Sequence, residues 1–287
     1  MSLPDPAGRG ALRRFLFTWI ALGLYGLSLA LTPWFGLPAW LGLAVVFGLG
    51  LPAVLLVAQE WSAHRPGRSQ AAVLVAAGAI TWLTTALLVR AGQPWWIWQP
   101  CNGAALLVTT YVVGNWLAGE LERPGHLVAV CVIGALADLW SATAGPTREL
   151  GAQVQQASLA AQHVQTGLPT PPPPLVSFLI LWWPVPGGGG MVTLIGFGDL
   201  VFFALLLAAA QRFALPRWRG FFLVLGGVAL SIALAAVLSR PLPALPAIGA
   251  LFVLGNLGRL PLRGREWLVT AGVAVTLGLF ALLWALR

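Results

Sequence analysis

The sequence predicts an all-α fold, a polytopic membrane bundle of about nine transmembrane helices, on the basis of three observations. Hydrophobic residues make up 59% of the chain and charged residues 8%, whereas roughly a quarter of residues are charged in a soluble domain. Apolar stretches close to the roughly 20 residues that cross a bilayer recur along the chain. Arginines lie in or beside the short connections between these stretches. These features exclude an ordinary soluble enzyme.

Each expected span is an apolar stretch bounded by polar, proline or glycine residues, and the eighth is the shortest. The first begins after several arginines, as a signal peptide does. We expect it to be retained as a span because it is long and lacks a convincing small-residue cleavage site. The nine spans are expected at about 15–32, 38–58, 71–90, 100–118, 126–144, 192–213, 218–238, 243–258 and 267–286.

All 16 basic residues are arginine, and the net charge is +8. When the connections are numbered from the N-terminus, twelve arginines fall on one side of the membrane and four on the other. This bias predicts a cytoplasmic N-terminus. Basic and aromatic residues do not interleave in a stripe, so we expect no nucleic-acid partner. The expected surrounding is the lipid bilayer, and the expected location is a multi-pass position in a prokaryotic cell membrane.

A polar connection is the one strong break in composition along the chain. Within it, Pro171 to Pro174 predict a stiff polyproline II spacer, and Gly187 to Gly190 predict a flexible joint. The apolar stretch from Leu175 to Val185 is about half a bilayer long, which favours a re-entrant or interfacial segment over a tenth span. The predicted divisions are an N-terminal membrane bundle at 1–145, the Pro- and Gly-rich polar connection at 146–191 and a C-terminal membrane bundle at 192–287.

Two of the eight acidic residues, Asp138 and Asp199, lie inside apolar spans. Carboxylates within the bilayer are costly and usually face a bundle interior or a water-filled cavity, so they indicate a functional site. The alternative is that each aspartate is protonated or caps a broken helix. Asp138 lies about six residues before the fifth span ends, and Asp199 about seven residues after the sixth begins. Both are therefore expected about 10 Å below the same membrane face, on antiparallel helices.

Two carboxyl groups that meet in a poorly solvated place cannot both ionise cheaply, so they share a proton. The ionised member can take a proton from water, while the neutral member donates a hydrogen bond to the carbonyl oxygen of an amide and stabilises the tetrahedral intermediate. The pair therefore predicts peptide hydrolysis if the two side chains come together.

Glycines flank Phe197 immediately before the second aspartate. Gly196 and Gly198 remove side-chain bulk where another backbone could approach closely. Close packing between helices explains small residues in a membrane span equally well. The G-x-G-D pattern is therefore a weak signal when it stands alone.

Three prolines interrupt the start of the eighth span, in the segment "RPLPALPAIG" from Arg240 to Gly249. Pro241, Pro243 and Pro246 each lack a backbone donor, so an ordinary helical start is not expected there. Irregular backbone at this depth is tolerated where it is buried in protein or lines a cavity. The number of connections places these prolines on the same side of the membrane as both aspartates.

The three motifs in this order resemble the presenilin and signal peptide peptidase family of intramembrane aspartyl proteases. The segment "GFGDLVFFALLLA" is similar to the family's G-x-G-D helix, "LPALP" to its P-A-L motif and "ADLWSATAGPTREL" to its first-aspartate segment. The resemblance covers roughly residues 126–258. It implies that Asp138 and Asp199 are the catalytic pair. It further implies that six residues shape the active site and position substrate, namely Gly196, Phe197, Gly198, Pro243, Ala244 and Leu245.

The family resemblance also implies the substrates, which are single-span membrane proteins whose helix is partly unwound at the scissile peptide. The segment before Asp199 could supply an extended edge with which such a strand pairs. No cofactor and no metal are implied. The three histidines, His64, His126 and His163, show no metal-binding spacing, so we expect no metal site.

The two aspartates also fit other functions. Type IV prepilin peptidases have a G-x-G-D-like motif, but they lack P-A-L. A proton-coupled transporter or channel could use Asp138 and Asp199 as a relay. A non-catalytic relative could bind membrane helices without cutting them, because Ala137 stands where the family usually has Tyr.

Overall fold

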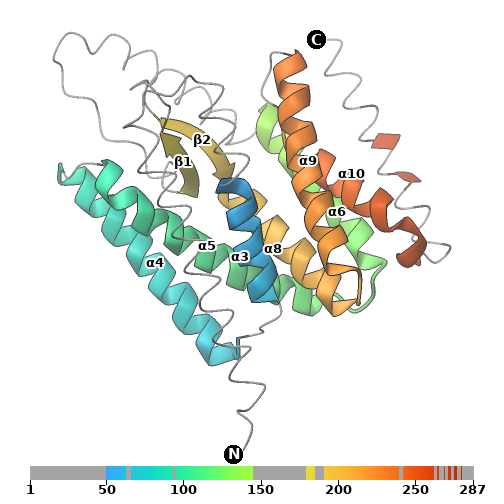
Figure 1. Cartoon of the computed structure of the whole chain (residues 1–287), viewed down its shortest axis with the longest axis horizontal. Coiled ribbons are helices and arrows are strands. Elements are labelled where there is room, and N and C mark those ends of the chain that lie inside the picture. Colours follow the sequence, from blue (N-terminus) through green and yellow to red (C-terminus); the bar gives the residue numbers. More distant parts are fainter. Residues whose placement is uncertain are drawn as a thin grey trace, which may run out of the picture. The chain divides into compact units, whose positions relative to one another are not determined.

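Seven α-helices, one 3₁₀-helix and two strands make up the described part of the chain in the computed structural model (Figure 1). The first expected span, at 15–32, and most of the second and ninth lie outside the described residues. Helices dominate, as predicted, but the strands were not expected as a hairpin. The structure describes residues 50–62, 66–92, 95–144, 179–184, 191–238 and 242–261, with a few isolated positions between 264 and 279.

The described residues divide into two compact units, and the division falls inside two helices, α5 and α8. The first unit takes the residues within Met1–Asn115 and Gln153–Ala204, and the second takes those within Trp116–Ala152 and Leu205–Arg287. The helices are α3 (Leu51–Ser62), α4 (Arg68–Arg90), α5 (Trp95–Glu120), α6 (His126–Ala144), α8 (Phe197–Arg212), α9 (Arg217–Leu238), α10 (Leu245–Asn256) and the 3₁₀-helix η4 (Leu257–Arg259). The strands are β1 (Ile180–Pro184) and β2 (Met191–Gly196).

The first unit has a core formed by α3, α4, α5 and the start of α8. Tyr111 and Val112 of α5 pack with Ala204 of α8, and apolar side chains of α3 and α4 cover them. Trp61 meets Tyr111 edge to face, with 5.1 Å between ring centroids. The Tyr111 hydroxyl oxygen accepts a hydrogen bond of 2.7 Å from Asn115 Nδ2, so this buried polar group is paired.

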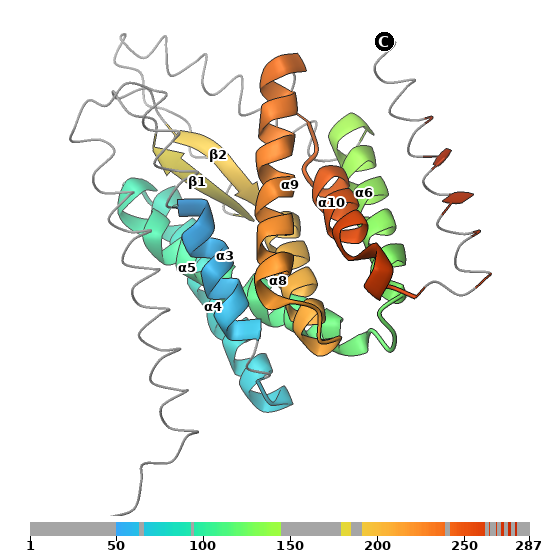
Figure 2. The same ribbon diagram turned by 45° about the vertical axis from the view of Figure 1, so that its right-hand side comes forward.

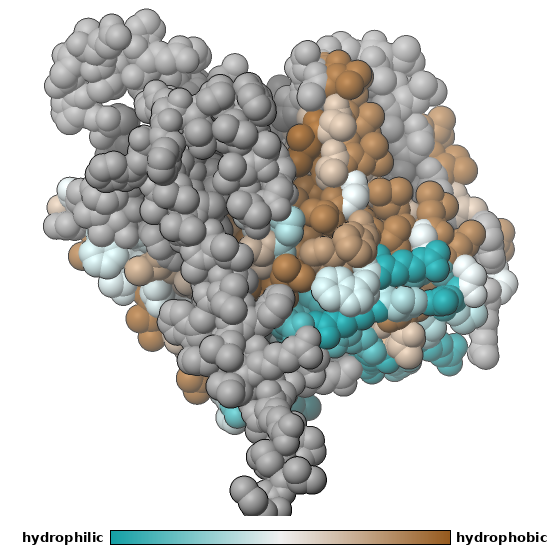
Figure 3. All heavy atoms as spheres, in the orientation of Figure 1, coloured by the Kyte–Doolittle hydropathy of each residue, from teal (hydrophilic) through white to brown (hydrophobic). Residues whose placement is uncertain are grey.

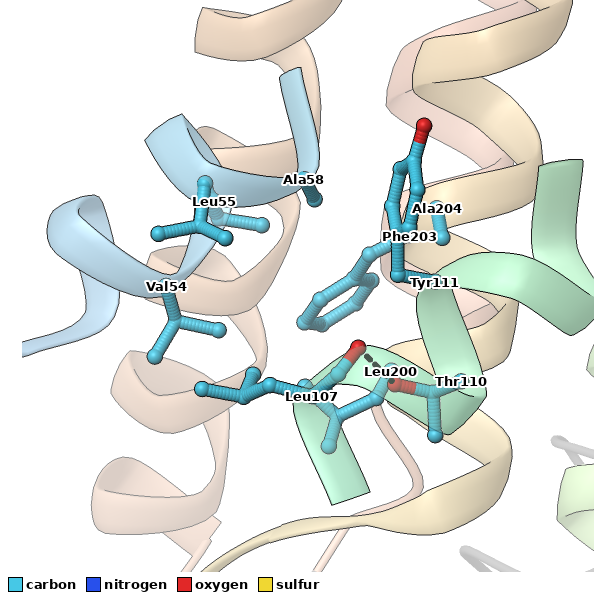
Figure 4. A pocket seen from close by; sticks show the side chains of 10 residues that line it. Val54, Leu55, Ala58, Leu107, Thr110, Tyr111, Leu200, Phe203 and Ala204 are labelled. Atoms are coloured by element: carbon cyan, nitrogen blue, oxygen red, sulfur yellow. Dashed lines mark hydrogen bonds between the residues drawn. The ribbon is translucent and has the colours of Figure 1, made fainter. Parts of the chain in front are cut away.

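A small cavity of about 10 Å³ lies in the same core (Figure 4). Apolar side chains such as Leu55 and Phe203 line most of it. The hydroxyl of Thr110 donates to the carbonyl of Leu106 within its own helix, at 2.7 Å. A space of this size holds one water molecule at most. It is therefore a packing gap in the core, not a ligand site.

The second unit is organised around α10, which packs against both α6 and α9 (Figure 2). Glycines make the close approach possible. A Cβ at Gly249 would lie 3.1 Å from Cys131 Cβ of α6, and a Cβ at Gly227 would lie 2.5 Å from Ile248 Cα of α10. Small residues at the contacts between apolar helices let backbones approach closely, as is common in membranes.

The polar residues of the second unit gather at one end of its helices. Hydrophilic atoms surround the part of α9 that begins at Arg217, and hydrophobic atoms follow the rest of that helix (Figure 3). Arg212 Nη1 donates to the carbonyl of Ala118 at 3.1 Å and to that of Gly119, and so caps the C-terminal end of α5. The start of α10 meets the end of α6, and the end of α10 meets the start of α9 through Gly255 and Leu223. Arg123, Arg219 and Arg259 therefore belong to this end too. All five arginines named here are among the twelve that the sequence predicts on one side of the membrane.

Two described helices are long and apolar enough to cross a membrane, Arg68–Arg90 and, within α9, Arg217–Ala235. Both expose large apolar residues: Val73 of the first is 66% exposed and Phe222 of the second is 61% exposed. α6 and α10 are apolar but shorter. The structure thus agrees with an apolar helical protein, and the full set of nine spans stays a prediction.

Candidate active site

Asp138 lies on α6, six residues before the helix ends at Ala144, where the sequence placed it. Its half-buried carboxyl group meets the start of α10. The backbone N–H of Leu245 donates to Asp138 Oδ2 at 3.0 Å, and the N–H of Ala244 lies near the same carboxyl group. The first-aspartate segment and the P-A-L motif, 107 residues apart, are therefore in direct contact. The predicted convergence of these two motifs is confirmed.

The prolines explain why α10 offers its donors to Asp138. The helix begins at Leu245, after non-helical residues that include Pro243, and Pro246 occupies its first turn. Proline is tolerated in the first turn because the N–H groups there have no partner within the helix. The first bond inside α10 runs from Ile248 N–H to the Ala244 carbonyl, at 3.1 Å. The N–H of Leu245, at the start of the helix, has no carbonyl partner within α10. It donates its hydrogen bond to the carboxyl group of Asp138.

Asp199 is the third residue of α8, and this corrects the prediction that places it about seven residues inside a helix starting at 192. Residues Met191–Gly196 form the strand β2. The β-branched residues Val192, Thr193 and Ile195 favour a strand, and pairing with β1 supplies the hydrogen-bond ladder that a helix would otherwise provide. The expected depth of about 10 Å for Asp199 was counted along a helix from 192, and that count does not apply to a strand.

The first turn of α8 holds the Asp199 carboxyl group. The N–H of Gly196, the residue before the helix, donates to Asp199 Oδ2 at 3.2 Å. This is one half of a capping box, in which a carboxylate three residues into the helix accepts the N–H of the capping residue. A carboxylate also suits the positive end of the helix dipole. The capping alternative raised for this aspartate is thus a real part of its environment.

The hairpin before Asp199 has its two strands paired antiparallel, from Ile180 opposite Gly196 to Pro184 opposite Met191. An irregularity in register falls between Leu181 and Trp182. Residues 191–196 are extended in β2, whereas the sequence predicts a helical span from 192. The glycine run at 187–190 lies outside the described residues. The sheet has two strands among the described residues, so each strand has one edge that no described strand covers. A helical tenth span is excluded for residues 180–184.

The two glycines of the G-x-G-D motif differ in their surroundings. A Cβ at Gly196 would lie 3.4 Å from Asp199 Oδ2, which is ordinary contact. At Gly198, which is exposed, a Cβ would meet no atom of the described structure within 4 Å. Folding therefore does not require glycine at 198, and the open space beside Asp199 is available to another chain. Phe197 between them is half-buried.

The two carboxyl groups belong to different units, Asp199 to the first and Asp138 to the second. Each has its own backbone donor, from Gly196 and Leu245 respectively. Their meeting stays a prediction. No group of three His, Cys, Asp or Glu side chains that could hold a metal ion occurs among the described residues.

Comparisons with models of known families, with curated proteins and with solved structures found no match to this chain. The resemblance to intramembrane aspartyl proteases therefore stays a prediction from the three sequence motifs.

Proposed function

We propose that this chain is an intramembrane aspartyl protease that hydrolyses peptide bonds within transmembrane helices. The observation that carries the proposal is the hydrogen bond from Leu245 of the P-A-L motif to Asp138. A proton relay requires no contact between these two motifs. A protease does benefit from this contact, because a backbone donor fixes the orientation of a carboxyl group that must act on water and on substrate.

A membrane setting is supported by the outer surfaces of the long helices. Apolar side chains of α4 such as Ile80 and Leu87 are more than half exposed, at 65% and 58%. A water-soluble protein rarely exposes so continuous an apolar face. In lipid these side chains lie in their preferred solvent, and the half-buried carboxyl groups of Asp138 and Asp199 are each held by a backbone N–H.

In the proposed reaction, the two aspartates hold one proton between them and act on a water molecule. The ionised carboxylate removes a proton from water as the oxygen attacks the scissile carbonyl carbon. The protonated carboxyl group donates its proton to the carbonyl oxygen, which yields a gem-diol. Collapse of the diol breaks the C–N bond, the amine leaves with a proton, and the products are a carboxylic acid and an amine. No cofactor is needed.

The edge of β2 that no described strand covers supports the proposal of an extended substrate. β2 ends three residues before Asp199, so a strand added along it would run toward that carboxyl group. A substrate helix must unwind to pair in this way, and unwinding also exposes the peptide bond to attack. The proposed substrates are single-span membrane proteins.

The test is cleavage of a single-span substrate by the purified protein in liposomes, with Asp138→Asn and Asp199→Asn as variants. Asn keeps an oxygen that accepts the Leu245 or Gly196 N–H, so folding should be preserved while proton transfer is lost. Glu122→Gln, in an exposed connection, is the matched control. Cleavage by the parent and the control but by neither Asn variant supports the proposal.

Full cleavage by both Asn variants would end the proposal. The parent could instead cut no substrate but carry protons across the liposome membrane. If both Asn variants abolish that transport, a proton-coupled transporter or channel replaces the protease as the proposed function. If the parent binds a substrate helix without cutting it, the protein is a non-catalytic relative.

A further inference from the structure

Ser231 carries the only hydroxyl group along α9, in the apolar run "GVALSIALAAVL". Its side chain is 95% buried, since 5% of its surface is exposed. A buried hydroxyl needs a hydrogen-bond partner, and in membrane helices it often uses a carbonyl of its own helix. Here the Ser231 hydroxyl donates across to the carbonyl of Pro243, at 3.3 Å. The P-A-L motif is thus held from α9 as well as from α6.

The accepting carbonyl belongs to the peptide unit directly before the one whose N–H donates to Asp138. The carbonyl of Pro243 and the N–H of Ala244 belong to the same planar peptide group, which is trans. In a trans peptide the C=O and N–H point in opposite directions. Ser231 therefore contacts one end of this unit. The Asp138 carboxyl group lies near the other end, where it accepts the N–H of the next residue, Leu245.

This carbonyl precedes the hydrogen-bond ladder of α10, whose first bond ends on Ala244. Ladder bonds therefore do not determine how the Pro243–Ala244 peptide is rotated. A neighbouring glycine contact brings α9 close enough for Ser231 to fix this rotation. Gly227 lies one helical turn before Ser231 on the same face and packs against Ile248. A hydrogen bond to the carbonyl also polarises the peptide and strengthens its N–H as a donor.

We propose that Ser231 is a positioning residue, which orients the Pro243–Ala244 peptide so that the P-A-L backbone donors hold the Asp138 carboxyl group ready for catalysis. This inference rests on the proposed function and adds a residue that none of the three motifs contains. Ser231 itself does not touch substrate.

The test compares Ser231→Ala, which removes the hydroxyl, with Ser231→Thr, which keeps it. We expect Ser231→Ala to lower kcat by roughly 3- to 10-fold, as loss of one neutral hydrogen bond would, with KM nearly unchanged. Ser231→Thr should restore most of the lost rate. Thr81→Ala is the control, because the Thr81 hydroxyl donates to Ala77 within its own helix, at 2.9 Å. A parental kcat in Ser231→Ala, or equal losses in the Ala and Thr variants, overturns the proposal.

Amide hydrogen exchange separates this inference from the proposed function. We expect the peptide covering 242–250 to exchange faster in Ser231→Ala than in the parent or Ser231→Thr, whether or not the protein cuts a substrate. Unchanged exchange would overturn the positioning role and leave the aspartate assignment standing. A parent that exchanges as expected but cuts nothing would refute the protease and retain the Ser231 contact as structural.

Discussion

Replacing Gly227 by alanine tests how closely α9 and α10 must approach. The added Cβ would lie 2.5 Å from Ile248 Cα, 2.9 Å from Ile248 Cγ1 and 3.0 Å from Ile248 N. Two of these atoms are backbone, so a change of side-chain rotamer does not relieve the clash. The helices must separate by roughly 1 Å to restore ordinary contact. Moving α10 away from α9 presses it against α6, where Gly249 already lies on Cys131.

The neighbouring Gly226 provides the matched control. A Cβ there would lie 3.8 Å from Leu251 Cδ1, which is ordinary contact. We expect Gly227→Ala to lower the free energy of unfolding by about 1–3 kcal/mol through overpacking. Gly226→Ala should leave it unchanged or raise it by up to about 1 kcal/mol, because alanine favours the helix.

The assay is equilibrium unfolding in mixed detergent micelles, with helix content followed by circular dichroism. Substrate cleavage is measured on the folded fraction. A shift of α10 would lengthen the 3.0 Å hydrogen bond from Leu245 to Asp138, so Gly227→Ala should also lose activity. Equal stability of the two alanine variants would refute the close-packing argument.

Three further predictions follow from single contacts. Gly198→Ala should keep the stability of the parent but lose most cleavage, since its Cβ meets open space that substrate would occupy; normal cleavage would show that substrate does not pass there. Arg212→Gln should lower the free energy of unfolding by about 1–2 kcal/mol, because the charged donor to the end of α5 is lost. A thermal melt in detergent measures this loss, and an unchanged melting temperature contradicts the prediction. Tyr111→Phe should cost about 1 kcal/mol in the same assay by removing the acceptor of the Asn115 amide, and no loss would show that this bond is dispensable.

Much of the helical part could be read from apolar runs and their polar boundaries. The expected spans at 71–90, 126–144 and 218–238 lie within three residues of α4, α6 and α9, because Arg68, His126 and Arg217 mark where apolar sequence begins. The position of Asp138 and its convergence with the proline-rich stretch followed from counting spans. Proline acts locally, through its missing N–H, so its effect on the start of α10 was visible in the sequence.

The hairpin was harder to predict, because strand and helix are hard to distinguish in a short apolar run. Residues 191–196 continue into an apolar helix without a polar boundary, and so resemble its first turn. Pairing with β1, which depends on a segment about ten residues earlier, decides the conformation. Because of this pairing, α8 begins at Phe197, and Asp199 lies in its first turn and not in the interior of the helix predicted from 192.

Composition determined the helical class by itself, and the order of three short motifs singled out the two candidate carboxyl groups and predicts peptide hydrolysis. These depend on local chemistry: apolar length, missing donors and the cost of burying charge. Only the tertiary structure decided which backbone groups hold each carboxyl group, that Gly227 and Gly249 let α10 pack closely, and that Ser231 reaches the Pro243 carbonyl. Contacts between distant segments depend on how helices rotate and approach, and no single stretch of sequence encodes that geometry.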